Sequence, residues 1–490
     1  MILKIDLPHQ QALVMMKKCV LTSLIGLLLL SSCASIKPQS AGLQVLEPSQ
    51  LALGDASNTN IEEAWWERFQ NKALSDLITS SLENNPSIAL ANTRIEKAQA
   101  LAGITRSATS VQMGASLDLD RQRFSQTGIY PPPLGGSMQS LTTLQLSGAW
   151  IPDVFGKYQA SYKSAVGQVQ ASALEALHAK NQLSAQITLQ FIALALSIDE
   201  RDMLLERKKH LTDLRQLLNE RVKAGLDASL DLKGQDIELN DLSTQLSQIE
   251  TQIDLSRHLL ATLSARAPLA LMTLSPHLSE IKAFEINAAL GIGLLGRRAD
   301  VVAAKSRVYA SLENVEAAKL DFYPNISLGF FSGFNTLNIN QLTQNASAQY
   351  GLVPSVNLPI FDGGRLNAQL SAKSAEKDQA IAIYNSTLLD ALKEASDALS
   401  IYKATSLELQ STQNSWVLAT QRLEIQSLKT KVGLGNQTSV LKERISQLQL
   451  QRAQAQWNAK HLSSAVLLLK SLGAGWPQND TANTVYAQKP

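Results

Sequence analysis

The two halves of the chain follow one plan, and this duplication restricts the possible fold more than any other feature. Landmarks in the first half recur in the second at offsets of 213 and then 208 residues. The aligned pairs are Pro86 with Ala299, Phe155-Gly156-Lys157 with Gly363-Gly364-Arg365, and Ala224-Gly225-Leu226 with Val432-Gly433-Leu434. Landmarks that keep their order in this way indicate two copies of one structural unit. Each copy is expected to run helix, strand, strand, long helix, tight turn, long helix.

Each half contains one long stretch without proline, from Asp153 to Ala267 and from Ile360 to Trp476. Because proline breaks helix interiors, these stretches predict long helices. Apolar residues recur in them at spacings of three and four, as in Ile187, Phe191, Leu194 and Ile198; Leu239, Leu242, Leu246, Ile249 and Ile253; Ile381, Tyr384, Leu388, Ala391 and Ala395; and Leu441, Ile445 and Leu448. Periodicity alone leaves open a coiled-coil seam or the core of an ordinary bundle. A helix of 67 residues from Lys157 to Lys223, roughly 100 Å long, favours the former.

A glycine interrupts each long stretch, at Gly225 and at Gly433. Glycine is the usual residue just past a helix end, so each stretch is predicted to be a helical hairpin. The residues available to cap the returning helices are Asp227 or Ser229 in the first half and Asn436 or Thr438 in the second.

Four segments between the helical parts alternate apolar and polar residues. They contain Val111 to Asp120, Thr143 to Ser147, Asn325 to Phe330, and Gln349 to Leu358. Strands of about ten residues with one polar face are typical of outer-membrane barrels, although a half-exposed soluble sheet shows the same alternation. The polar stretches Ser125 to Gly136 and Asn335 to Asn345 are predicted to join the strands of each pair at extracellular tips. Since membrane barrels need about eight strands or more, four strands require several chains to close.

The N-terminal residues have the order of a secretory signal. Lys17 and Lys18 precede a short apolar run that ends at Leu30, and Met1, Met15 or Met16 could be the true start. The sequence Leu30-Ser31-Ser32-Cys33 resembles a lipobox, so Cys33 is predicted to be acylated, for example by palmitate, after cleavage; an incidental cysteine is the alternative. Ala34 fits the pattern for sorting to the outer membrane.

Charge and motif content exclude several classes of function. Without residues 1–32 the chain carries 41 basic and 41 acidic side chains, which gives no basic footprint for nucleic acid. The six histidines have no metal-ligand spacing, and no glycine-rich phosphate loop follows a strand. The sequence therefore predicts no enzyme, no metal and no cofactor. It also has no apolar run of about eighteen residues after the signal, so a membrane-spanning helix is not expected.

Three motifs carry a resemblance to a known family. They are Leu294-Leu295-Gly296-Arg297-Arg298-Ala299-Asp300-Val301, Asp321-Phe322-Tyr323-Pro324-Asn325-Ile326-Ser327-Leu328, and Phe361-Asp362-Gly363-Gly364-Arg365. Together they resemble outer-membrane efflux proteins of the TolC and OprM type, in particular the lipidated NodT-like branch, from Trp65 to about Gly475. The resemblance implies an α+β membrane protein. Three chains would pool four strands each into a twelve-stranded β-barrel, continued by a long periplasmic α-helical barrel of coiled-coil hairpins.

The same resemblance implies a function without catalysis. The homotrimer would be the outer-membrane channel of a tripartite efflux pump, anchored in outer-membrane lipid through Cys33. It would passively conduct drugs or other small molecules received from an inner-membrane transporter and a periplasmic membrane-fusion adaptor. A type I secretion channel is the alternative within this fold, and a structural coiled-coil envelope lipoprotein is the alternative outside it. Neither the substrate nor the class of pump follows from the sequence.

By this resemblance the hairpin tips would face the adaptor. The predicted docking residues are Ala224, Gly225, Leu226, Ser229, Val432, Gly433, Leu434 and Gln437. Family members often carry aspartates just past the second tip, where this chain departs from the pattern with Ser439 and Lys442. Asp231 could supply negative charge at the periplasmic entrance, or be a solvated surface residue. We expect a structural role for Arg298, which would tie adjacent parts together, and for Asp300, which would cap the next helix.

These interpretations divide the chain into eight regions. They are a signal peptide (1–32), an N-terminal segment with the first helices (33–108), a first strand pair (109–151), a first helical hairpin (157–267), equatorial helices (268–322), a second strand pair (323–360), a second helical hairpin (365–472) and a flexible C-terminal tail (473–490).

Overall fold

The computed structural model describes residues 42–47, 63–286 and 298–475. The predicted signal peptide, the lipobox with Cys33, the motif residues 294–297 and most of the predicted C-terminal tail lie outside the described residues. Among the residues that are described, no helix carries an apolar stretch sufficient to cross a bilayer.

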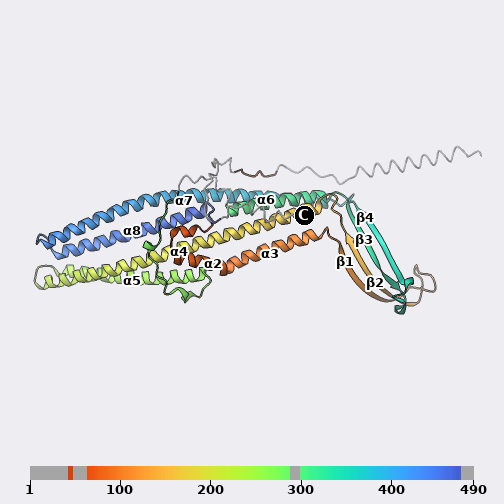
Figure 1. The fold of residues 1–490 in the computed structure, drawn as a ribbon, viewed down its shortest axis with the longest axis horizontal. Coiled ribbons are helices and arrows are strands. Elements are labelled where there is room, and N and C mark those ends of the chain that lie inside the picture. Colours follow the sequence, from red (N-terminus) through yellow and green to blue (C-terminus); the bar gives the residue numbers. More distant parts are fainter. Residues whose placement is uncertain (1–41, 48–62, 287–297, 476–490) are drawn as a thin grey trace, which may run out of the picture. The chain divides into compact units, whose positions relative to one another are not determined.

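The helices and strands repeat in the two halves with equal helix lengths (Figure 1). Helices α3 (Pro86–Ser107) and α6 (Ala299–Leu320) each have 22 residues, α4 (Lys157–Lys223) and α7 (Arg365–Lys431) each have 67, and α5 (Ser229–Leu263) and α8 (Gln437–Ser471) each have 35. The strands are β1 (Gln112–Arg123), β2 (Met138–Trp150), β3 (Asn325–Thr336) and β4 (Ala348–Asn357). The predicted duplication is therefore confirmed, element by element.

Two compact units make up the fold, and the long helices contribute residues to both. One unit contains the described parts of Met1–Gln44, Ala98–Val169 and Arg307–Ile381, and the other contains those of Val45–Lys97, Gln170–Ser306 and Ala382–Pro490. The four strands belong to the first unit, and the larger part of each helical hairpin, with its tip and the main apolar core, belongs to the second.

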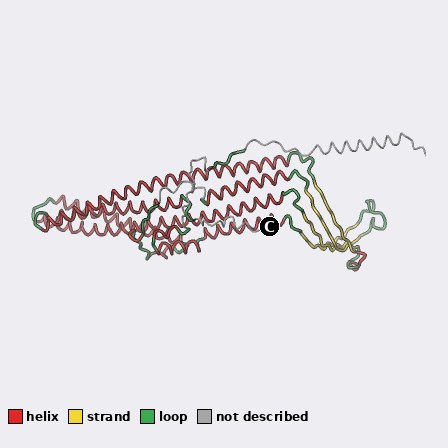
Figure 2. The backbone as a smooth tube through the Cα atoms, turned by 45° about the horizontal axis from the view of Figure 1, so that its top comes forward, coloured by secondary structure: helices red, strands yellow, loops and turns green. Residues whose placement is uncertain are grey.

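The four strands form one antiparallel sheet in the order β1-β2-β3-β4, seen as the yellow segments of Figure 2. The register aligns Leu117 with Leu144 and Leu144 with Phe334 on one face. In the same register, the neighbouring residues Asp118, Thr143 and Asn335 align with one another on the other face. The sheet thus has one apolar and one polar face, as the alternation predicted, and β1 and β4 are its edges.

Side-chain amides and hydroxyls connect across the polar face. The Asn335 side-chain amide donates to the Thr143 hydroxyl at 2.9 Å, and the Gln349 side-chain amide donates to the side-chain Oε1 of Gln145 at 3.2 Å. The second contact joins β2 to β4 across Gly333 on the strand between them. A Cβ atom at Gly333 would lie 2.1 Å from the carbonyl oxygen of Leu144, so only glycine allows β2 and β3 to approach here.

The core of the second unit gathers short elements around the long helices. The 3-10 helix η2 (Trp65–Phe69) and helix α2 (Lys72–Asn84) pack there with buried residues of α4, α5, α7 and α8. Trp65 is fully buried, and its indole donates to Asn181 at 3.1 Å. The heptad-spaced residues predicted in α4 and α7 are also buried, including Phe191 and Leu388.

The stretch 268–322 was expected to hold equatorial helices. In its described part, the short 3-10 turns η3 (Pro268–Leu271) and η4 (Leu278–Glu280) come before the 22-residue helix α6. One boundary of the predicted regions needs correction. At the other end, Ala474 is 2% exposed and packs in the core, so the predicted flexible tail does not begin at residue 473.

Candidate functional site

The two hairpin tips have the same backbone geometry. After α4, the N–H of Leu226 donates to the Arg221 carbonyl at 2.9 Å and that of Gly225 donates to Val222 at 3.0 Å. After α7, Leu434 and Gly433 make the equivalent bonds to Lys429 and Thr430 at 2.8 and 3.2 Å. This paired pattern is the Schellman motif, which needs a left-handed residue after the helix.

The tip glycines supply that left-handed residue. Gly225 has φ of +72° and Gly433 has φ of +79°, and no atom lies within 4 Å of where a Cβ would stand at either position. Backbone conformation, not lack of space, is therefore the reason for glycine at both tips.

Large apolar side chains stand in solvent at both tips. Leu226 is 67% exposed and Leu434 is 81% exposed, and Val432 beside the latter is 69% exposed. The apolar residue after a Schellman glycine usually packs back on its own helix. These two leucines do not pack back, so each tip exposes an apolar side chain.

The returning helices begin differently from one another. Asn436 caps α8 by accepting the Ser439 N–H at 2.8 Å, one of the two predicted alternatives. The prediction for α5 was wrong, because Ala228 is its N-cap and no side chain caps it. Asp227 instead binds Arg221 in a bidentate ion pair at 2.6 and 2.9 Å. This ion pair holds the pKa of the Asp227 carboxyl below its usual range.

The residues considered for a periplasmic entrance lie close to these tips. Asp231 is exposed in the first turn of α5, where an acidic side chain favourably opposes the helix dipole. Ser439 lies in the first turn of α8 and serves the Asn436 cap through its backbone. Lys442 is exposed on α8, and its charge also lowers the pKa of Asp227.

Ion pairs join the first hairpin to the second. Arg452 on α8 donates to Glu200 on α4 at 2.9 Å, and Arg444 on α8 donates to Glu206 on α4 at 2.8 Å. The Glu200 side chain is only 9% exposed and also accepts from Gln456 at 2.5 Å. Sequence spacing could not identify these contacts, because the partners are more than two hundred residues apart.

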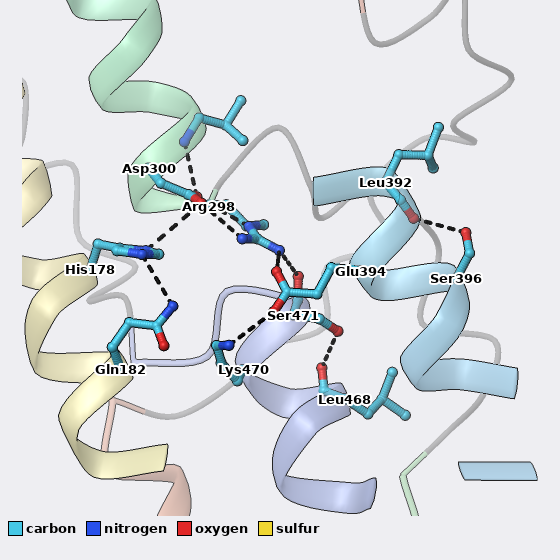
Figure 3. Close-up of polar contacts among 11 residues, drawn as sticks. His178, Gln182, Arg298, Asp300, Leu392, Glu394, Ser396, Leu468, Lys470 and Ser471 are labelled. Atoms are coloured by element: carbon cyan, nitrogen blue, oxygen red, sulfur yellow. Dashed lines mark hydrogen bonds and ion pairs between the residues drawn. The ribbon is translucent and has the colours of Figure 1, made fainter. Parts of the chain in front are cut away.

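A second polar cluster surrounds Arg298 (Figure 3). Its guanidinium donates to Asp300 at 2.8 and 3.1 Å, to Glu394 on α7 at 2.8 Å and to the Ser471 carbonyl of α8 at 3.1 Å. Lys470 binds the other oxygen of Glu394 at 2.9 Å. Arg298 thereby links the start of α6 to α7 and α8, as expected. Asp300 lies inside α6 and accepts the Val301 N–H at 3.0 Å, so it stabilises the first turn without being the N-cap itself.

Burial and charge act against each other in this cluster. Burial raises the pKa of Asp300, but hydrogen bonds and attraction from Arg298 outweigh it, so the carboxyl titrates below its usual range. The pKa of the Glu394 carboxyl is also lowered, because hydrogen bonds and attraction from Lys470 and Arg298 outweigh the effect of burial. Burial lowers the pKa of His178, which lies 3.9 Å from Asp300. The cluster is thus two carboxylates and two cations beside a neutral imidazole at neutral pH.

The apolar face of the sheet is open to its surroundings in the single chain. Met113, Leu117 and Leu119 on β1 are 57 to 62% exposed, and Tyr350, Leu352 and Val356 on β4 are 66 to 84% exposed. Apolar residues exposed along whole strands mark a surface that contacts lipid or another chain.

A duplicated amphipathic sheet with paired helices of this length defines the protomer of an outer-membrane channel. The family model described as "Outer membrane efflux protein" matches residues 77–266 and 293–474, and the chain belongs to this family. The family and the fold are those of channels.

Relatives and solved structures agree with this assignment. The chain is 25% identical over 481 residues, 94% of its length and 97% of the relative's, to the multidrug resistance outer membrane protein MdtP of Escherichia coli O157:H7. It is 31% identical over 361 residues to the fusaric acid resistance protein FusA of Burkholderia cepacia, covering 71% of this chain and 68% of that one. The crystal structure of the outer membrane protein VceC of Vibrio cholerae matches with a TM-score of 0.77 and 27% identity, over 85% of this chain and 100% of that chain.

Proposed function

We propose that this chain forms, as a homotrimer, the outer-membrane duct of a tripartite efflux pump. Small molecules would pass through it passively from an inner-membrane transporter and a periplasmic membrane-fusion adaptor to the exterior. The chain would contribute no catalysis of its own. Family membership and the multidrug and fusaric acid resistance named for its relatives support this function.

The amphipathic sheet carries the proposal. It has one apolar exposed face and two edge strands, β1 and β4, whose backbone groups need partners if lipid surrounds them. If β4 of one copy pairs with β1 of another, the backbone groups of both edge strands gain hydrogen-bond partners, and the apolar face of each sheet lies on the outside of the closed barrel. Three copies would give a closed sheet of twelve strands, with the polar face and its Asp118, Thr143 and Asn335 ladder toward the conduit.

The hairpin tips would dock the adaptor. Exposed Leu226 and Leu434 offer apolar contact, and the Schellman turns hold both in the same conformation. The proposed docking set is Ala224, Gly225, Leu226, Ser229, Val432, Gly433, Leu434 and Gln437. Asp231, Ser439 and Lys442 would lie beside the entrance, and the acyl chain on Cys33 would add a lipid anchor.

Photo-crosslinking in intact cells tests the docking end. A crosslinker at Ser229 or Gln437 should capture a periplasmic adaptor, and one at exposed Thr251 further along α5 should not. The double variant Leu226→Ser, Leu434→Ser should reduce capture roughly tenfold or more, since each buried leucine contributes about 1.5–3 kcal/mol. The matched variant Leu205→Ser changes an exposed leucine on α4, away from both tips, and should leave capture unchanged.

Other captures would separate the alternatives. Capture of a secreted polypeptide with an ATP-driven exporter would favour a type I secretion channel. Capture of peptidoglycan-associated proteins alone would refute the duct and favour a structural lipoprotein. Labelled palmitate should appear on the wild-type protein and disappear in Cys33→Ser while the trimer still assembles; label that persists would refute the lipidation site.

A further inference from the structure

The two halves of the chain meet inside the sheet along one pair of strands, and the two edges of the sheet are the equivalents of that pair. Strand β2, the second strand of the first half, pairs with β3, the first strand of the second half. The edges are β4, the second strand of its half, and β1, the first strand of its half. A contact between β4 of one copy and β1 of the next would therefore repeat the β2–β3 contact with equivalent strands.

The pairing within each half gives the residue-by-residue equivalence of the strands. Gln112 pairs with Ala149 in the first half, and Asn325 pairs with Asn357 in the second. Asn325 lies 213 residues after Gln112, and Asn357 lies 208 residues after Ala149. These are the same two offsets at which the landmarks of the sequence recur. A position in β3 thus converts to its equivalent in β1 by subtracting 213, and a position in β2 converts to its equivalent in β4 by adding 208.

The β2–β3 register, converted in this way, predicts which residues of two copies lie opposite each other. Ser147 of β2 pairs with Phe331 of β3. Their equivalents are Ser355 of β4 and Asp118 of β1, which would therefore lie opposite each other across the seam between copies. The same conversion gives eight pairs within the bounds of the two strands, from Asn357 with Ser116 to Tyr350 with Arg123.

Side chains that meet in this register suit each other on both faces of the sheet. On the apolar face, Val356 lies opposite Leu117, and these side chains are 67% and 57% exposed in the single chain. Tyr350, which is 84% exposed, lies opposite Arg123, so its ring can stack on the guanidinium. On the polar face, a serine hydroxyl can donate to a carboxylate. A slip of one residue would exchange the two faces, so only slips of two residues compete with this register.

Apolar contacts between the helical hairpins follow the same rule within their own unit. Helix α4 of the first half packs with α8 of the second in an apolar cluster, where Ile445 of α8 is only 8% exposed. The equivalent of Ile445, 208 residues earlier, is Ile237 of α5, which is 64% exposed in the single chain. Contact between α5 of one copy and α7 of another, the equivalent of α4, would cover this side chain.

A polar contact between the hairpins repeats in the same way. Glu200 of α4 accepts from the Gln456 side chain of α8 at 2.5 Å. Their equivalents by the offset of 208 are Glu408 of α7 and Gln248 of α5, again a glutamate and a glutamine. Both are exposed in the single chain. The outer helices thus carry both members of a hydrogen-bonded pair that the chain already uses between its halves.

We infer that neighbouring copies of this chain join through the same contact that joins its two halves. In the sheet, β4 of one copy pairs with β1 of the next, and Ser355 lies opposite Asp118. In the helical unit, α7 of one copy packs on α5 of the next, which buries Ile237 and lets Glu408 accept from Gln248. Because two different surfaces meet, the contact is head-to-tail and closes into a ring. The inference rests on the proposed trimer and adds the register and residues of its seams.

Cysteine pairs in the full-length protein test the strand register. Oxidation of the double variant Asp118→Cys, Ser355→Cys should link copies into dimers and trimers on a non-reducing gel. Within one chain these positions lie about 14 Å apart across three strand spacings, too far for a disulfide. Ser116→Cys or Asp120→Cys, each combined with Ser355→Cys, tests a slip of two residues on the same face. These pairs should give about fivefold less product, because roughly 7 Å would separate their Cβ atoms.

A neighbouring cysteine pair protects this test against unfavourable local geometry. Hydrogen-bonded and non-hydrogen-bonded pairs alternate along antiparallel strands, so Leu117→Cys with Val356→Cys samples the other type and should also link. The wild type is the oxidation control, since Cys33 is present in every variant.

A charge placed in the inferred helical seam tests the second contact. Ile237→Asp should lower the yield of trimer, measured by chemical cross-linking, about tenfold, because an unpaired charge would be buried. Leu230→Asp is the matched control on the same helix. The equivalent of Leu230 is Thr438, which lies outside the apolar cluster of α4 and α8, so this variant should assemble like the wild type.

The register and the trimer itself are tested separately. Chemical cross-linking of the wild type detects the trimer without any cysteine pair. A trimer in which only the slipped pairs form disulfides would overturn the inferred register and leave the proposed function intact. Absence of a trimer in the wild type would overturn both. A full yield of trimer in Ile237→Asp would overturn the inferred helical contact.

Discussion

Replacing Arg298 by methionine should weaken the helical unit more than replacing any surface cation. Arg298 is 5% exposed and bonds Asp300, Glu394 and the Ser471 carbonyl. Breaking a buried ion pair by removing one partner typically costs about 3–5 kcal/mol, because the remaining charge is left unpaired. Here Glu394 keeps Lys470 at 2.9 Å and is partly solvated, so we expect a cost below that range, about 2–3 kcal/mol.

The measurement is the urea concentration at which the purified protein loses tryptophan burial, followed by fluorescence. Lys393→Ala is the matched control, because Lys393 lies one residue from Glu394 and forms an ion pair with Asp397 whose side chains are 75% and 57% exposed. Such surface pairs contribute about 0.2–1 kcal/mol. If Arg298→Met unfolds at the same urea concentration as Lys393→Ala, the cluster does not hold α6 to α7 and α8, and the reasoning fails.

Two more predictions follow from described contacts. Burial lowers the pKa of the His178 imidazole below its ordinary 6.5; Arg298 and Lys470 lower it further, while Asp300 and Glu394 partly oppose the shift. As the pH falls below about 6.5, the unfolded chain therefore binds a proton at this histidine more readily than the folded chain does, and the folded state loses stability. Urea midpoints should therefore drop between pH 7 and pH 5.5, and less so in His178→Gln; an identical drop in that variant would disprove this role. Gly333→Ala should reduce the yield of the proposed trimer, measured by chemical cross-linking of the purified protein, since its Cβ would lie 2.1 Å from the Leu144 carbonyl oxygen. Gly114→Ala, with open space around it, should leave the yield unchanged, and equal yields from the two variants would contradict the close approach.

Local patterns predicted the elements well because each depends on neighbouring residues. A left-handed glycine ends a helix whatever its tertiary surroundings, so Gly225 and Gly433 marked both tips correctly. The alternation of apolar and polar residues likewise predicts which face of the sheet each side chain lies on, and the register confirmed this prediction for Leu117, Leu144 and Phe334.

The sequence failed where a side chain chooses between partners. Asp227 is a good capping residue, yet Arg221 offers it a charged partner six residues back, and the ion pair is what forms. Glu200 and Arg452 carry no signal of their pairing, because their distance is set by how two hairpins pack.

The two tips have the same backbone conformation, but different side-chain contacts stabilise them, and these contacts respond differently to ionic strength. An ion pair between Arg221 and Asp227 braces the first turn, and salt screens such pairs over roughly 10 Å at 0.1 M. The neutral Asn436 cap braces the second, and salt leaves it almost untouched. Higher ionic strength should therefore weaken the side-chain brace of the first tip more than that of the second, while the backbone hydrogen bonds that shape both turns stay in place.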